Sequence, residues 1–185
     1  MINVTLFSSS KAVSSVISTV LMVALVVILA ATVSVFVLDL TGEGNQPAPI
    51  VKQSSGELIV QDNSSGGKIN LTHVAGDSLT ASNLEIVVNA EDPCGKSGRL
   101  VNLPAPGNDL RPTSEYVRGD DIFDNSWNSV DGPIGEADAK WEAGETATFR
   151  LASSECQLDS GDTIIVRVVH TPTNSIIIEE TLTAT

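Results

Sequence analysis

The sequence contains few of the residues that usually carry catalysis. Two histidines and two cysteines occur in 185 residues, and aromatic residues make up 4%. No G-x-S-x-G nucleophile motif, phosphate-binding glycine loop or H-E-x-x-H helix is present. We therefore predict no catalytic residue, no resident metal or cofactor, and no enzyme activity.

Positive charge is also scarce. Lys and Arg total 10 against 23 Asp and Glu, and every acidic residue lies at Asp39 or later. Phosphate binding needs clustered cations, so nucleic acid is excluded as an expected partner. The acidic residues are interpreted as a solvated surface, which also fits a halophilic, high-salt habitat.

Charge is missing altogether between Lys11 and Asp39, within the run KAVSSVISTVLMVALVVILAATVSVFVL. As a helix, residues 13–40 would be roughly 42 Å long, more than the roughly 30 Å of a bilayer's hydrocarbon core. The run is apolar on all sides, unlike a surface helix. It therefore predicts a transmembrane helix over residues 13–40.

Three interpretations of this segment remain open. A secretory signal would be removed after a site such as Ala30-Ala31, although its apolar region is normally shorter. A permanent anchor would keep Lys11 on the cytoplasmic side. In the third interpretation, a polar leader of residues 1–12 is removed and the apolar helix begins the mature protein.

The remainder of the chain predicts a linker at 41–49 and one β-rich head domain at 50–185. Short apolar runs with two-residue alternation recur between turn residues, which favours antiparallel pairing. Around Pro172-Thr173-Asn174 we expect a hairpin, and long loops over 95–144. The predicted strands are Glu57–Val60, Lys68–Val74, Leu84–Asn89, Thr146–Ala152, Thr163–Thr171 and Ser175–Thr183.

Several of these stretches occur together in one known family. Lys11-Ala12 precedes the apolar helix, and the head contains KINLTHVAGDSLTASNLEIVV, WEAGETATFRL and SGDTIIVRVVHTPTNSIIIEETL. In these features the chain closely resembles archaeal type IV pilins of the halophilic euryarchaeal kind. The resemblance implies a class III signal peptide that prepilin peptidase cleaves between Ala12 and Val13, leaving a long N-terminal hydrophobic helix.

The expected fold class is α+β, the helix being followed by an antiparallel β-sandwich-like (Ig-like) head. The resemblance implies a membrane-inserted precursor that an assembly ATPase and its membrane platform protein extract into an extracellular pilus. Helices 13–40 would then pack together in a helical filament through self-assembly, with the heads outside mediating surface adhesion. The alternative is a membrane-anchored monomeric extracellular binding domain.

Four residues of the head are candidates for covalent modification. If the head lies outside the cell, Cys94 and Cys156 are permitted to form a disulfide, and the alternative is two unpaired, small hydrophobic residues. Asn63 and Asn70 each begin an N-x-[ST] glycosylation triplet.

Other polar and aromatic residues receive structural interpretations. His73 and His170 each end a predicted strand, where sheet-edge hydrogen bonding is favoured over a shared metal or a catalytic pair. The acidic segment 120–132 is interpreted as a solvated loop rather than a calcium site, because it lacks the EF-hand order. Trp127 and Trp141 are interpreted as core or loop anchors rather than ligand platforms.

Overall fold

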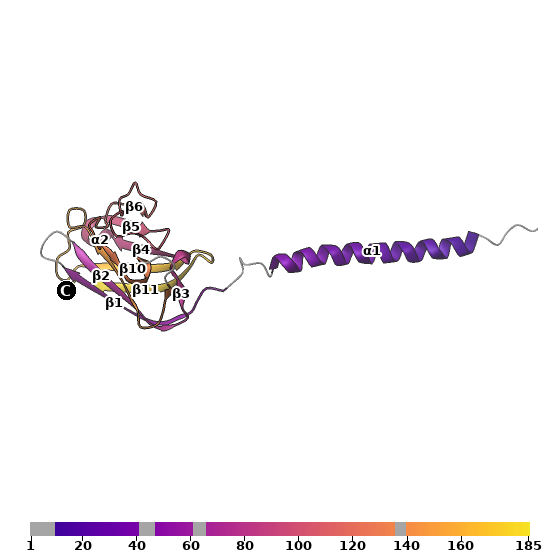
Figure 1. Ribbon diagram of the computed structural model, residues 1–185, viewed down its shortest axis with the longest axis horizontal. Helices are drawn as coiled ribbons and strands as arrows, with labels where there is room; N and C mark the ends of the chain where they lie inside the picture. Colours follow the sequence, from indigo (N-terminus) through magenta and orange to yellow (C-terminus); the bar gives the residue numbers. More distant parts are fainter. Residues whose placement is uncertain (1–9, 41–46, 61–65, 136–139) are drawn as a thin grey trace, which may run out of the picture. The chain divides into compact units, whose positions relative to one another are not determined.

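The computed structural model describes residues 10–40, 47–60, 66–135 and 140–185 (Figure 1). Chain contacts divide the protein into two compact units, Met1–Gln46 and Pro47–Thr185. The first contains helix α1, Ser10–Leu40, which includes the whole predicted helix 13–40. The rest of the predicted leader, residues 1–9, lies outside the described residues.

The second unit is the head, and it is built from antiparallel sheets, which confirms the predicted α+β class. One sheet has the strand order β1-β2-β9-β7 and the other β11-β10-β4-β5-β6, while β3 and β8 form a separate pair. The strands are β1 Val51–Val60, β2 Gly67–Gly76, β3 Leu79–Thr80, β4 Leu84–Ala90, β5 Lys96–Leu100, β6 Val117–Gly119, β7 Val130–Asp131, β8 Lys140–Trp141, β9 Thr146–Leu151, β10 Thr163–His170 and β11 Ser175–Thr183.

Alternation along the strands explains which faces are buried. In β10, Ile164, Val166 and Val168 are buried, and the residues between them are only partly buried. The predicted hairpin is confirmed, because β10 pairs with β11 across the turn at 171–174. Side chains from both large sheets belong to one buried hydrophobic cluster, so the two sheets enclose a common core.

The two sheets also meet along one edge, between β1 and β11. Leu58 forms a parallel bridge with Ala184, and Ser54 Oγ donates a hydrogen bond to Glu180 Oε1 at 2.5 Å. Between these contacts, Gly56 leaves space for Leu182, which a Cβ at position 56 would strike. The C-terminal residue Thr185 is held to β1 by backbone hydrogen bonds with Leu58 and Val60.

The prediction of long loops over 95–144 holds for 101–116 and 120–129, but it missed the short strands that separate these loops. Strands β5 and β6 extend the five-stranded sheet, and β7 pairs with β9 in the other sheet. Strands β6 and β7 are too short for a two-residue alternation to appear in the sequence, and β5, with the sequence KSGRL, has only one large apolar side chain. The segment also supplies core side chains, namely Leu100, Leu103, Leu110, Val117, Ile122, Phe123, Val130 and Ile134. Non-local burial therefore orders a stretch whose composition is typical of loops.

Candidate assembly helix and head surface

Helix α1 presents apolar side chains on every side. Its segment Val16–Ser34 is long and apolar enough to cross a membrane, and none of it is buried within the described structure. Hydroxyl groups in this segment donate to carbonyl oxygens one turn earlier: Thr19 to Val16, Thr32 to Leu29 and Ser34 to Ala30. These hydroxyls are thereby satisfied inside the helix and can enter an apolar environment without another partner.

The predicted cleavage residues lie at the beginning of this helix. Lys11, Ala12 and Val13 all fall within the first turn of α1, and their side chains lie outside the described set. Further along, small residues interrupt the large apolar ones at Ser18, Ala24, Ala30, Ala31 and Ser34. Small residues allow the backbones of neighbouring helices to approach closely.

At the beginning of the head, the chain is fixed to the end of β2. The backbone N–H of Ile50 donates to Asp77 Oδ2 at 2.9 Å, and the N–H of Asp77 donates to the Ile50 carbonyl at 2.9 Å. Gly76, which directly precedes Asp77, adopts φ +142°, and a Cβ there would strike the backbone of Ile50 and Val51. We call this pair of bonds the Ile50–Asp77 clamp. The sequence analysis did not identify it, although the Gly-Asp pair marks the turn.

The same region joins two of the motifs that carried the resemblance. His73 Nε2 lies 2.9 Å from the Asp77 carbonyl, and its ring meets Trp141 edge to face with centroids 6.4 Å apart. Trp141 Nε1 donates to the carbonyl of Glu145, which also accepts the backbone N–H of His73. The Trp-x-x-Gly-Glu segment therefore braces the end of β2 and is a structural motif.

Cys94 and Cys156 form a disulfide with a Cα–Cα distance of 5.3 Å, which confirms their pairing. Cys94 ends the short helix α2, Glu91–Cys94, between β4 and β5. Cys156 is buried in the connection from β9 to β10, which passes from one sheet to the other. The bond therefore ties the five-stranded sheet to the crossover between the sheets.

The structure describes one of the two glycosylation triplets. Asn63 lies outside the described residues. Asn70 lies in the middle of β2, between β1 and β9, and is partly buried. Its side chain donates to Glu57 Oε2 at 3.3 Å and accepts from Thr148 Oγ1 at 3.0 Å. A glycan on Asn70 would have to replace these two contacts, and its presence stays a prediction.

The described residues contain no cluster of three or more His, Cys, Asp or Glu that could hold a metal ion. His73 and His170 are both buried and bond locally, the second through Nδ1 to Thr173 Oγ1 at 2.8 Å. In segment 120–132, Asp120 Oδ2 accepts the N–H of Ser97. The carboxylate of Asp124 likewise accepts from Ser126 and that of Asp131 from Gly132, so these acids stabilise turns.

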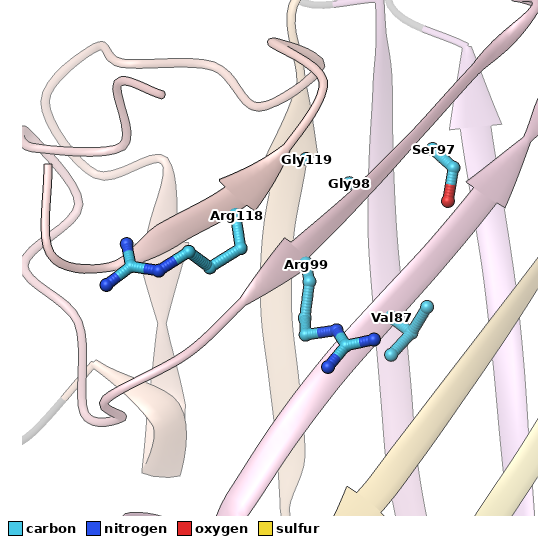
Figure 2. A pocket seen from close by; sticks show the side chains of 6 residues that line it. All are labelled: Val87, Ser97, Gly98, Arg99, Arg118 and Gly119. Atoms are coloured by element: carbon cyan, nitrogen blue, oxygen red, sulfur yellow. The ribbon is translucent and has the colours of Figure 1, made fainter. Parts of the chain in front are cut away.

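A shallow concavity on the five-stranded sheet brings two arginines together. Arg99 and Arg118 are directly paired across β5 and β6, with Gly98 and Gly119 beside them. Figure 2 shows their guanidinium groups pointing in opposite directions. Arg99 forms an ion pair with Glu85 at 3.1 Å, and Arg118 donates to the carbonyls of Ser114 and Val117. The two cations therefore do not converge on a common anion.

In the part of the chain that the structure describes, one membrane-length apolar helix precedes one disulfide-bonded β head. Residues 11–52 match the family described as "Archaeal Type IV pilin, N-terminal". The N-terminal part of the chain is therefore similar to the N-terminal domain of archaeal type IV pilins. This finding confirms the resemblance seen at Lys11-Ala12 and in the apolar helix.

A relative from Archaeoglobus fulgidus, named an uncharacterized protein, is 33% identical over 88 residues. The match covers 48% of this chain and 59% of the relative, so the chain spans less than two thirds of that relative's length. The pilin family is structural rather than enzymatic.

Proposed function

We propose that this chain is the structural subunit of an archaeal type IV pilus, which polymerises through α1 and mediates adhesion outside the cell. The observation that carries the proposal is the apolar segment Val16–Ser34, none of which is buried in the described structure, within the region that matches the pilin N-terminal family. Twelve large apolar side chains of α1 are more than half exposed. Burying each is worth about 1.5 to 3 kcal/mol, so the helix gains roughly 20 to 35 kcal/mol by leaving water.

Lipid supplies that environment before assembly, and helices of other copies supply it afterwards. An apolar surface on every side suits a helix with neighbours all around it. The hydroxyl groups bonded within α1 add no unsatisfied donors to such a core. Exchange of lipid for helix contacts then depends on close packing, which the small residues of α1 favour.

Cleavage of the leader between Ala12 and Val13 allows the helix to move out of the membrane into the filament. With the leader attached, outward movement of the helix would draw Lys11 into hydrocarbon, at about 2.5 to 3.5 kcal/mol. Prepilin peptidase removes this barrier, and an assembly ATPase with its membrane platform protein then moves the helix into the filament. The head coats the outside, and its disulfide suits an oxidising exterior.

Intact-mass measurement of the native protein tests the proposal. A chain beginning at Val13 in purified filaments is expected. A mass that retains Met1–Ala12 would instead favour a membrane-anchored monomeric binding domain. A chain beginning near Thr32 would favour a secreted domain.

A charge reversal at Lys11, compared with the same change elsewhere in the chain, tests the predicted cleavage site. Lys11→Glu should leave full-length precursor in the membrane, because the basic residue before the cut is lost. The control Lys52→Glu makes the same charge change on an exposed residue of β1 and should be processed normally. Equal processing of both variants would contradict the assigned cleavage site.

A further inference from the structure

The two tryptophans occupy opposite environments. Trp141 is fully buried, as the sequence analysis expected, whereas Trp127 is 76% exposed, the most exposed large apolar side chain described in the head. The interpretation of Trp127 as a core or loop anchor is therefore wrong. Leaving a large apolar side chain in water forgoes about 1.5 to 3 kcal/mol of burial, so an exposed indole needs an explanation.

The backbone around Trp127 is held on both sides. Before it, Phe123 is buried, and Asn125 Oδ1 accepts the backbone N–H of Leu110 at 2.9 Å. After it, Asn128 adopts φ +64°, and the buried Ser129 donates its hydroxyl to the Gly107 carbonyl. These contacts keep the segment from folding inward, so the indole stays presented to solvent.

An open concavity of about 430 Å³ lies against the same segment. Its polar lining includes Arg111, Asp121, Asp124 and Asn125, and Ser126, which also lines it, directly precedes Trp127. This volume is within the range of small-molecule sites, about 300 to 1,000 Å³. The concavity therefore supplies guanidinium, carboxylate, amide and hydroxyl groups, and the exposed Trp127 follows its lining residue Ser126 directly in the chain.

We propose that Trp127 and this concavity bind a neutral saccharide chain, an inference that rests on the proposed adhesive function and specifies its ligand. A pyranose ring has an apolar C–H face that can lie on an indole. Its hydroxyl edges match the paired donors and acceptors of Arg111, Asp121 and Asn125. Three acidic residues of the lining, Asp121, Asp124 and Glu155, outnumber Arg111, which disfavours an acidic sugar.

Acrylamide quenching of tryptophan fluorescence can measure binding to the full-length protein, in a detergent without sugar groups. Trp141 is buried, so the quencher reports mainly on Trp127. Cellohexaose or chitohexaose should lower the quenching constant at least threefold, whereas an alginate hexamer should leave it unchanged. Absence of protection by both neutral oligosaccharides, or equal protection by alginate, would overturn the proposal.

Retention on insoluble cellulose and chitin then tests the residue. Trp127→Ala should reduce retention at least tenfold, Trp127→Phe should stay within threefold of wild type, and Arg111→Ala should weaken it. Ile176→Ala is the matched control, since Ile176 is an exposed apolar residue elsewhere in the head. Equal losses for Ile176→Ala and Trp127→Ala would mean general hydrophobic adsorption and would overturn the saccharide site.

Electron microscopy separates this proposal from the filament proposal. Trp127→Ala cells should form normal pili, because Trp127 belongs to the head unit and is not a residue of α1. Loss of pili in this variant alone would place Trp127 in a subunit contact and refute the saccharide site. Wild-type protein that never forms filaments would instead refute the proposed function.

Discussion

A single acidic side chain in the assembly helix should abolish pili, and Val23→Asp is the sharpest such change. Val23 lies inside the uncharged segment Val16–Ser34 and is 62% exposed, so in the proposed pilus its side chain would meet lipid or another helix. In the precursor, Asp near the middle of a spanning helix costs about 2.5 to 3.5 kcal/mol, roughly a hundredfold in the spanning population.

The filament core should be at least as unfavourable for this carboxylate. In a bilayer, snorkelling and local water reduce the cost of a charge, whereas a closely packed helix core offers neither. An unpartnered buried charge costs about 3 to 5 kcal/mol, so subunits that do reach the membrane should also add poorly to the filament. We expect pili to decrease at least a hundredfold while the head stays folded.

Electron microscopy of cells, with immunoblots of membrane and filament fractions, measures both steps. Val23→Ala is the control for lost side-chain volume. Ile176→Asp is the control for added charge, because this residue is an exposed part of the head. Both controls should form pili. Normal pili on Val23→Asp cells would refute burial of α1 in the filament core.

Two further predictions concern the stability of the head. Cys94→Ala with Cys156→Ala should lower the free energy of unfolding by about 4 kcal/mol, since the bond closes a separation of 62 residues. Guanidinium denaturation followed by Trp141 fluorescence measures this free energy. A decrease of less than about 1 kcal/mol would contradict the chain-entropy argument. Asp77→Ala removes the side-chain half of the Ile50–Asp77 clamp and should destabilise the head by about 0.5 to 1.5 kcal/mol. Faster amide exchange at Ile50 is the expected signature, and unchanged exchange there would show that the clamp is not formed in solution.

Local patterns predicted the elements that depend on neighbouring residues. An uninterrupted apolar run makes α1 a helix wherever lipid or other helices surround it, because its backbone groups must be paired within the segment. The β10–β11 hairpin follows from alternating residues on both sides of a short turn. Strands β5 to β8 were not predicted, because each is short and acquires its pairing from distant partners.

The contacts between distant strands of the head, and the exposure of its tryptophans, arise only from the tertiary structure. The β1–β11 edge joins residues more than a hundred positions apart, and His73, Asp77 and Trp141 meet because β2 ends beside the Trp-x-x-Gly-Glu turn. The two tryptophans show the difference most clearly, since both lie among polar and small residues in the sequence. Whether an indole is buried depends on which distant side chains cover it, and this information is not contained in the residues beside it in the sequence.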